Sequence, residues 1–195
     1  MRYDKGHKDA TRRRIIDVAS RQFREQGVAA VGIAAIMTEA GLTNGAFYAH
    51  FGSKEDLVRE VFSNTGSKRN DMWQAATESS VGLESAIRGY LSPGHRDNPG
   101  RGCPISALVA EIARHPKATR RAFAGKMTDI IALIATHLHV EAESERWRKA
   151  VAIYGLMVGT LQLARAIDDK RLSEEVLQSG VTAALALIGG SEAVR

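Results

Sequence analysis

The hydrophobic positions of the N-terminal part of the chain recur at helical spacing. Ile15, Ala19 and Phe23 follow one another at intervals of four residues, with arginines on the other faces. This spacing predicts an amphipathic helix that closes near Gly27. A second apolar stripe over residues 32–40 predicts a short helix that is ended by the next glycine.

A third, very short helix is expected after a tight turn. Thr43 or Asn44 can cap its N-terminus, because their side-chain oxygens accept backbone amides at a helix start. Phe47 and Phe51 lie one helical turn apart and face the same side. These positions predict a short helix that is anchored by two aromatic rings.

Hydrophobic residues recur at helical spacing in the rest of the chain, and no alternating pattern predicts a strand there. Ser53 stands three residues before Asp56, which is a variant of the capping box and predicts a helix beginning at Lys54. One-sided apolar stripes follow over residues 83–91, 105–112, 123–138 and 177–188. The pattern therefore predicts an all-α protein.

One segment interrupts these stripes. Residues 92–102 contain two prolines and three glycines. Because these residue types punctuate regular structure, the segment is expected to be a loop and the most flexible part of the chain.

Size and composition narrow the class of protein. A chain of 195 residues can bury a core without disulfide or metal support. Its single cysteine, Cys103, cannot form an intramolecular disulfide, and no secretory signal pattern is visible, so a cytoplasmic location is expected. The longest uncharged run, residues 150–164, falls short of the roughly 20 apolar residues that cross a bilayer. We therefore expect no membrane partner.

Positive charge is concentrated at the N-terminus. Residues 1–24 hold eight basic residues against three acidic ones. A basic segment suits a polyanion, because each neutralised phosphate releases condensed counterions. A solvated basic tail is the alternative, and charge alone does not separate the two.

Residues 33–51 place two short helices around a tight turn at residues 41–43. In a helix-turn-helix, this geometry presents the second helix to the major groove of DNA, although the same spacing also occurs as plain packing in all-α proteins. The second helix begins with small residues at 44–46, which would let its backbone approach DNA closely. It ends with Tyr48 and His50, which can donate hydrogen bonds to phosphates.

The same stretch resembles the N-terminal signature of the TetR family of transcriptional regulators. Residues 36–43 resemble its I-A-x-x-A-G-(V/L)-(S/T) turn, and residues 48–57 match its Y-x-H-F and (S/G)-K-E-x-L segments. The likeness in sequence covers about residues 11–60. The remainder resembles the family only in its architecture. It implies a helix-turn-helix DNA-binding domain over residues 1–55 and a larger helical effector-binding and dimerisation domain over residues 56–195.

The resemblance also assigns roles to single residues. It implies that Thr43, Tyr48, His50 and Lys54 contact phosphates and that Asn44, Gly45 and Ala46 face base edges. Lys54 has a physical rationale as well, because the free amides at a helix start attract phosphate. Asn44 is the only obvious hydrogen bonder for base edges, so DNA shape or the basic arm is expected to carry part of the specificity. Two positions depart from the family pattern: Val31 replaces a usual capping Thr, and Met37 a usual Ala.

The last two helices carry the candidate dimer interface. Residues 150–161 are apolar almost all round, and Gly155 and Gly159 permit close helix approach. An intrachain core also explains this pattern. The resemblance instead implies a four-helix interface in a homodimer, with the two recognition helices roughly 34 Å apart on a pseudo-palindromic operator. The predicted interface residues are Ala150, Tyr154, Gly155, Val158, Gly159, Leu177, Val181, Leu185 and Ile188.

The resemblance places a pocket for a small-molecule effector among the central helices. The candidate lining residues are Ser106, Glu111, His115, Met127, His137, Trp147 and Tyr154. Each of them also fits an ordinary core or surface position, and no pattern identifies the effector. We expect no cofactor and no metal: Glu111 and His115 share a helix face, but no third ligand is spaced with them.

Cys103 is a candidate redox sensor. It precedes Pro104, which fits the first position of a helix, so its sulfur could lie near a helix N-terminus, where the thiolate is favoured. Arg101 adds positive charge nearby. A buried small hydrophobe is the alternative role for a lone cysteine.

Together these observations predict a ligand-responsive transcriptional repressor that binds its operator as a homodimer and is released by a small-molecule effector. It is not expected to be an enzyme, because no nucleophile elbow, phosphate-binding glycine loop or metal motif appears. Two alternatives stay open: an enzyme that uses Cys103, or Glu111 with His115, and a helical adaptor that binds only protein. Of these three candidate functions, the repressor alone requires a DNA affinity that falls steeply as the salt concentration rises.

Overall fold

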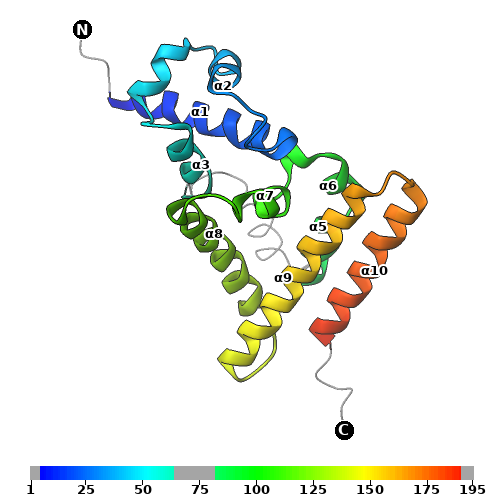
Figure 1. The fold of residues 1–195 in the computed structure, drawn as a ribbon. Helices are drawn as coiled ribbons and strands as arrows, with labels where there is room; N and C mark the ends of the chain where they lie inside the picture. The colour runs from blue at the N-terminus through cyan, green and yellow to red at the C-terminus, as the bar shows by residue number, and fades with distance from the viewer. Residues whose placement is uncertain (1–4, 64–81, 190–195) are drawn as a thin grey trace. The chain divides into compact units, whose positions relative to one another are not determined.

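The computed structural model describes residues 5–63 and 82–189, and these residues form helices joined by turns, without a strand among them (Figure 1). The all-α prediction is confirmed. The chain groups into two compact units: the first comprises residues 1–64 and 99–125, and the second comprises residues 65–98 and 126–195. Residues 56–63 and 99–125 therefore belong to the same compact unit as the predicted helix-turn-helix. The boundary between two domains after residue 55 stays a prediction.

The first unit is built on the long helix α1 (Lys5–Gln26). The other elements of this unit are α2 (Ile33–Glu39), the 3-10 helix η1 (Asn44–Ala49), α3 (Lys54–Ser63), the 3-10 helix η2 (Pro99–Arg101), α7 (Pro104–Ile112) and the first part of α8 (Lys117–Thr136). α1 packs against α2, α3, α7 and η2. This arrangement places both short helices of the predicted DNA-binding motif within the first unit.

Local sequence signals account for the ends of these helices. Ile15, Ala19 and Phe23 are fully buried along α1, as their spacing predicts. The helix ends before Gly27, whose φ of 84° suits a residue without a side chain. α3 begins after Ser53, whose Oγ accepts the backbone amide of Asp56 at 3.0 Å, so the predicted cap is confirmed.

The third predicted helix is a 3-10 helix. Thr43 takes its N-cap position with extended backbone, but its side chain makes no capping hydrogen bond, and the helix covers only residues 44–49. Phe47 and Phe51 are both buried, with 5.4 Å between their ring centroids. The predicted aromatic anchor is confirmed, and it fixes η1 against the rest of the first unit.

The second unit contains α5 (Gly82–Tyr90), α6 (Pro93–Asp97), the rest of α8, α9 (Glu143–Ala166) and α10 (Lys170–Gly189). α9 and α10 lie side by side (Figure 1), and α5 packs against α10. Gly180 permits this close approach, because a Cβ at that position would collide with the side chain of Thr160. Ile153, Met157 and Leu177 belong to the buried core of this unit.

The prediction of a loop over residues 92–102 was wrong. The structure forms α6 and η2 within this segment. Ser92 caps α6 by accepting the backbone amide of His95 at 3.2 Å, and Pro93 occupies the first helical position, where its missing amide costs nothing. The Ser-Pro pair is a helix start signal. It was outweighed in the prediction by the prolines and glycines of this segment, which favour a loop.

Across the part of the chain that the structure describes, no helix combines the length and the apolar character needed to cross a membrane.

Candidate nucleic-acid interface

The 3-10 helix η1 combines one buried side chain, that of Phe47, with exposed side chains around it. Phe47 is fully buried, and its ring meets the ring of Tyr48 edge to face, with 5.3 Å between centroids. Tyr48 itself is 66% exposed. Residues 43–45 are also exposed, and Ala46 is half-buried. The small side chains that open η1 and the Tyr48 hydroxyl are therefore within reach of a large ligand.

His50 follows η1 and lies close to two cations of α1. Its Nδ1 is buried, with no hydrogen-bond partner among the described residues. Partial burial and the charges of Lys8 and Arg12 lower the pKa of His50 below its ordinary 6.5. Arg12 also stacks over the Phe51 ring at 4.9 Å and pairs with Glu60 at 3.0 Å. The basic N-terminal helix thus adds positive potential beside a histidine that was predicted to contact phosphate.

Lys54 is engaged within the protein. Its Nζ donates a hydrogen bond to the carbonyl oxygen of Val28 at 2.5 Å. The carboxylate of Glu111 accepts the backbone amides of Val28 and Ala29 at 2.8 and 2.6 Å. The backbone between α1 and α2 is therefore held by an ammonium group and a carboxylate. A phosphate contact of Lys54 stays a prediction, and in this structure the side chain fixes the entry to α2.

Two further contacts support the short helices. Nε and Nη2 of Arg24 donate to the carbonyl oxygen of Gly100 at 3.1 and 2.5 Å. Glu55 lies 3.1 Å from Nδ1 of His115 and accepts a hydrogen bond from Thr119. These contacts, like that of Glu111, join residues far apart in sequence and leave no local pattern. Sequence reasoning therefore missed them and considered Glu111 and His115 only for effector binding, metal binding or catalysis.

The two departures from the family pattern are both buried. Val31 is 2% exposed and Met37 is fully buried. α2 has Gly32 at its N-cap, so no side chain is available there to cap the helix. These substitutions therefore affect packing around α2 and remove one candidate phosphate contact.

The predicted dimer residues fall into two groups. Ala150, Tyr154, Leu177 and Val181 are buried within the protomer. Gly155, Val158, Gly159, Leu185 and Ile188 are exposed or half-buried. Val151 and Leu163, which the sequence pattern did not single out, are also exposed on α9 at 42% and 62%.

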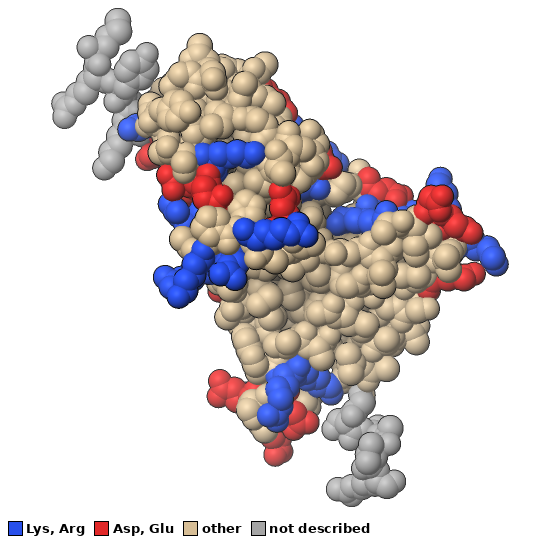
Figure 2. Space-filling view, in the orientation of Figure 1, with Lys and Arg blue, Asp and Glu red and all other residues tan. Residues whose placement is uncertain are grey.

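Figure 2 shows that the face of the second unit over α9 and α10 carries few charged side chains between its two ends. An apolar strip of α9 is thus accessible on the protomer surface.

The effector candidates are divided between the two units: Ser106, Glu111 and His115 lie in the first, and Met127, His137, Trp147 and Tyr154 lie in the second. Trp147 lines an open cavity of about 870 Å³ in the second unit. The other lining residues are Ala132, Ala135, Thr136, Leu138, Glu143, Ser144, Arg146 and Arg148. His137 bonds instead to the carbonyl oxygen of Leu133 at 2.9 Å, and Tyr154 is buried near Tyr90. Met127 is half-buried on α8.

Cys103 is buried at the N-cap of α7, where Pro104 takes the first helical position as predicted. Ser106, one of the effector candidates, is also buried and donates a hydrogen bond to the carbonyl oxygen of Cys103 at 3.0 Å. Within residues 5–63 and 82–189, no group of three or more His, Cys, Asp or Glu side chains is placed to hold a metal ion.

Comparison with known sequences identifies relatives of the N-terminal part. Residues 15–61 match a family model described as bacterial regulatory proteins, tetR family. The chain is 40% identical over 62 residues to the HTH-type transcriptional regulator AcrR of Shigella flexneri, covering 32% of this chain and 29% of that protein. It is 28% identical over 117 residues to the HTH-type transcriptional regulator LmrA of Bacillus subtilis strain 168, covering 57% and 62% of the two chains. The matched segments thus span less than two thirds of either relative.

Solved structures resemble nearly the whole chain. A TetR-family transcriptional regulator from Streptomyces coelicolor superposes with a TM-score of 0.65 at 25% identity, covering 92% of this chain and 96% of that one. A TetR-family regulator from Cytophaga hutchinsonii gives a TM-score of 0.77 at 19% identity, covering 98% and 100%. At the latter identity the likeness shows a shared fold.

Proposed function

Because this chain belongs to the TetR family of bacterial regulatory proteins, we propose that it is a transcriptional regulator that binds operator DNA through η1 and the start of α1. The observation that carries this proposal is the exposed start of η1, which is fixed to the first unit by two buried phenylalanines. A rigid short helix with small side chains at its start can lie deep in a major groove.

Base edges and phosphates are contacted by different residues in this proposal. Asn44, Gly45 and Ala46 face the bases, and Asn44 supplies the hydrogen-bonding side chain. Thr43, Tyr48, His50 and Lys54 bind phosphates. Lys8 and Arg12, whose charges act on His50, add attraction that does not depend on sequence.

The regulator acts as a homodimer in this proposal. The accessible residues Val151, Gly155, Gly159 and Leu163 lie on α9, where a second copy of the helix would cover them. A two-fold axis would place the two η1 helices about one DNA turn apart, roughly 34 Å, and require a pseudo-palindromic operator.

Repression and its release by an effector are the further parts of the proposal. The cavity beside Trp147 offers an indole ring, an apolar wall at Ala132 and Leu138, and polar groups at Ser144 and Arg148. This combination suits a small organic molecule with an aromatic part. An effector releases DNA only if it binds the DNA-free conformation more tightly than the DNA-bound one.

A regulatory role is favoured over an enzyme because the charged groups considered for catalysis have structural partners. Glu111 accepts two backbone amides, and His115 lies beside Glu55. We place the protein in the cytoplasm, where an operator is accessible. If DNA affinity does not fall steeply with salt, a helical adaptor that binds only protein is the better interpretation.

The salt dependence of DNA affinity tests this function. We expect the affinity for a selected duplex to fall steeply between 50 and 200 mM salt, since each neutralised phosphate contributes about −0.9 to the logarithmic slope. Lys8→Gln should reduce the magnitude of this slope by about 1. Arg88→Gln, which removes an equal charge from an exposed position on α5, should leave it unchanged. A shallow slope in the wild type contradicts the proposal.

A compound screen read by DNA release tests the effector site. Ala135 is half-buried and lines the cavity, so Ala135→Phe should fill part of that space. A compound that releases DNA from the wild type should not release it from Ala135→Phe, whose DNA affinity should be unchanged. Release from both proteins at equal concentration would place the effector elsewhere.

A further inference from the structure

Four basic side chains lie on the surface of the first unit where α7 passes into α8. They are Arg114, in the turn after α7, and Lys117, Arg120 and Arg121, in the first turns of α8. All four are exposed. Residues 113–128 contain no aspartate or glutamate, so no acidic side chain of the same segment balances their charge. We refer to these four residues as the α8 basic patch.

The patch lies on the accessible side of α8. Lys117, Arg120 and Arg121 are spaced at i, i+3 and i+4, so they share one side of the helix. Thr119 and Phe123, which lie one turn apart on the other side, are buried. The start of α8 therefore packs on the first unit through one face and presents its basic face to the surroundings.

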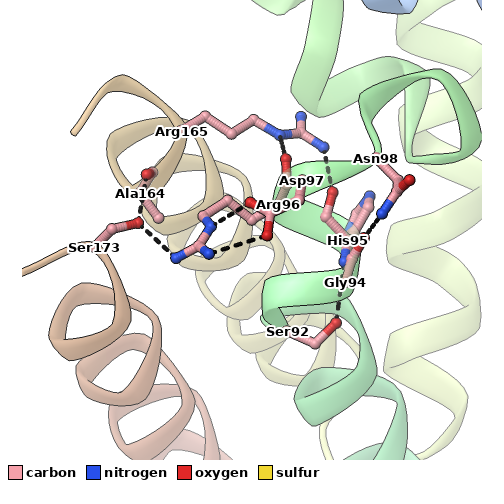
Figure 3. Close-up of polar contacts among 9 residues, drawn as sticks. All are labelled: Ser92, Gly94, His95, Arg96, Asp97, Asn98, Ala164, Arg165 and Ser173. Atoms are coloured by element: carbon pink, nitrogen blue, oxygen red, sulfur yellow. Dashed lines mark hydrogen bonds and ion pairs between the residues drawn. The ribbon is translucent and has the colours of Figure 1, made fainter. Parts of the chain in front are cut away.

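Other arginines of this chain have bonded partners in the folded protein. Arg96 donates to Oγ of Ser173 at 2.9 Å (Figure 3). Arg165 donates to the carbonyl oxygens of His95 and Arg96 at 2.8 and 3.1 Å (Figure 3). Across residues 5–63 and 82–189, in contrast, the structure gives no ion pair or side-chain hydrogen bond to any member of the α8 basic patch. Their charges are therefore available to a ligand.

The patch is unfavourable for α8 by itself. Like charges three and four residues apart repel one another, and cations in the first turn oppose the helix dipole. The first turn of α8 contains no acidic residue, whereas the first turn of α3 contains Glu55 and Asp56. A polyanion bound at the patch would neutralise the repulsion and complement the dipole, so the arrangement favours a negatively charged partner.

The α8 basic patch is fixed beside the start of α3. Nδ1 of His115 lies 3.1 Å from the carboxylate of Glu55, and Thr119 donates a hydrogen bond to the same carboxylate. Glu55 follows Lys54, a predicted phosphate contact, at the start of α3. It is also five residues from His50, so their Cα atoms lie within about 18 Å of each other. This span is shorter than one turn of DNA, which is roughly 34 Å.

We propose that the α8 basic patch is a second DNA-binding surface, which contacts phosphates of the same duplex outside the stretch that η1 reads. This inference rests on the proposed function, because it requires η1 to hold the duplex. Three of the four residues are arginines, whose planar guanidinium groups bind phosphate oxygens in pairs. Such contacts add affinity and carry no base preference of their own. The phosphate-binding surface of the first unit thus extends from η1 and α3 to the start of α8.

The salt dependence of affinity for duplexes of two lengths tests this surface. The short duplex ends at the selected operator, and the long one continues for about 10 base pairs on each side, one further helical turn. Arg120→Gln combined with Arg121→Gln should reduce the magnitude of the logarithmic slope on the long duplex by about 2 for each bound protomer. The slope on the short duplex should equal that of the wild type. An unchanged slope on the long duplex, or an equal reduction on both duplexes, would overturn the proposal.

The start of α10 supplies a matched control. Lys170→Gln combined with Arg171→Gln removes the same charge from exposed side chains in the first turn of a helix in the second unit. There the cations are balanced, because Asp168 and Asp169 precede them and Arg171 pairs with Glu175 at 3.6 Å. This variant should keep the wild-type slope on both duplexes.

Two further measurements separate lost contacts from lost structure. Arg120→Lys combined with Arg121→Lys keeps the charge and should keep the slope close to that of the wild type. The thermal midpoint of the glutamine variant should not fall, because both replaced side chains are exposed and repel their neighbours. If it falls, Arg114→Gln combined with Lys117→Gln takes its place in the same test.

Failure of this inference differs from failure of the proposed function. A wild type that binds no duplex at low salt would reject both. A wild type that binds with a steep slope, while both glutamine variants of the patch bind with that same slope on the long duplex, would reject the second surface alone.

Discussion

The carboxylate of Glu111 on α7 accepts the backbone amide of Val28, a residue 83 positions earlier in the chain, at 2.8 Å. The same carboxylate accepts the amide of Ala29 at 2.6 Å. Both amides lie in the turn between α1 and α2, where no helical partner is available to them. Glu111 therefore accepts backbone amides of this turn as a capping side chain does at a helix start, although it belongs to a helix distant in sequence.

Glu111→Gln should lower the free energy of unfolding by about 1–2 kcal/mol, because an amino group replaces one of the two carboxylate oxygens that accept these amides and the charge assistance is lost. Denaturant titration measures this change. Glu84→Gln is the matched control, since Glu84 is exposed on α5 and pairs with Arg88 one turn away. Equal effects of the two substitutions would mean that the Glu111 contact adds nothing beyond a surface charge.

Tyr48→Phe should weaken operator binding about tenfold and change the free energy of unfolding by less than about 0.5 kcal/mol. The ring keeps its packing on Phe47, while the hydroxyl that would bond to a phosphate is lost. Fluorescence anisotropy with a selected duplex measures the first effect and thermal unfolding the second. Unchanged affinity would remove Tyr48 from the phosphate contacts.

The stability of the protein should fall as the pH is lowered below about 6.5, in part through His95. Burial lowers the pKa of His95, the hydrogen bond to the Tyr90 carbonyl raises it, and Arg165 lowers it, with a net decrease. The unfolded chain therefore binds more protons than the folded one between the folded pKa and 6.5. The stability contribution is complete above the unfolded pKa and is lost as the pH falls through this window.

His95→Gln should flatten this dependence, which is measured by denaturant titrations between pH 5 and pH 8. His7→Gln is the control, because His7 is exposed. An unchanged slope in His95→Gln would show that His95 takes up its proton at the same pH in the folded and unfolded chains.

Gly159→Ala should raise the dissociation constant of the dimer, although it should stabilise the isolated protomer by roughly 0.5–1 kcal/mol. A Cβ at this position meets open space among the described residues, so any steric cost comes from a second copy. Gly125→Ala on α8 is matched to it, because it also meets open space and makes the same gain in helix propensity. Sedimentation at several concentrations distinguishes the two variants, and equal dissociation constants would place the interface away from Gly159.

Features set by neighbouring residues could be predicted from the sequence. The end of α1 before Gly27, the Ser53 cap and the pair Phe47 and Phe51 all follow from local spacing and local hydrogen bonding. α6 was missed because the prolines and glycines around it outweighed the Ser92-Pro93 start signal.

The long-range contacts could not be predicted. A glutamate on an amphipathic helix gives the same sequence pattern whether it faces water or, like Glu111, two backbone amides. Arg24 likewise belongs to a run of basic residues, and its burial against Gly100 depends on how η2 meets α1. For the same reason, sequence could not separate Ala150, which is buried within the protomer, from Gly155, which is exposed on the same helix.

Selection of bound sequences from a random duplex pool tests most directly the claim that this chain binds an operator as a two-fold symmetric dimer. We predict enrichment of a pseudo-palindrome whose half-sites lie about one helical turn apart, roughly 10 base pairs between centres. No enrichment at low salt, or an enriched site without two-fold symmetry, would contradict it.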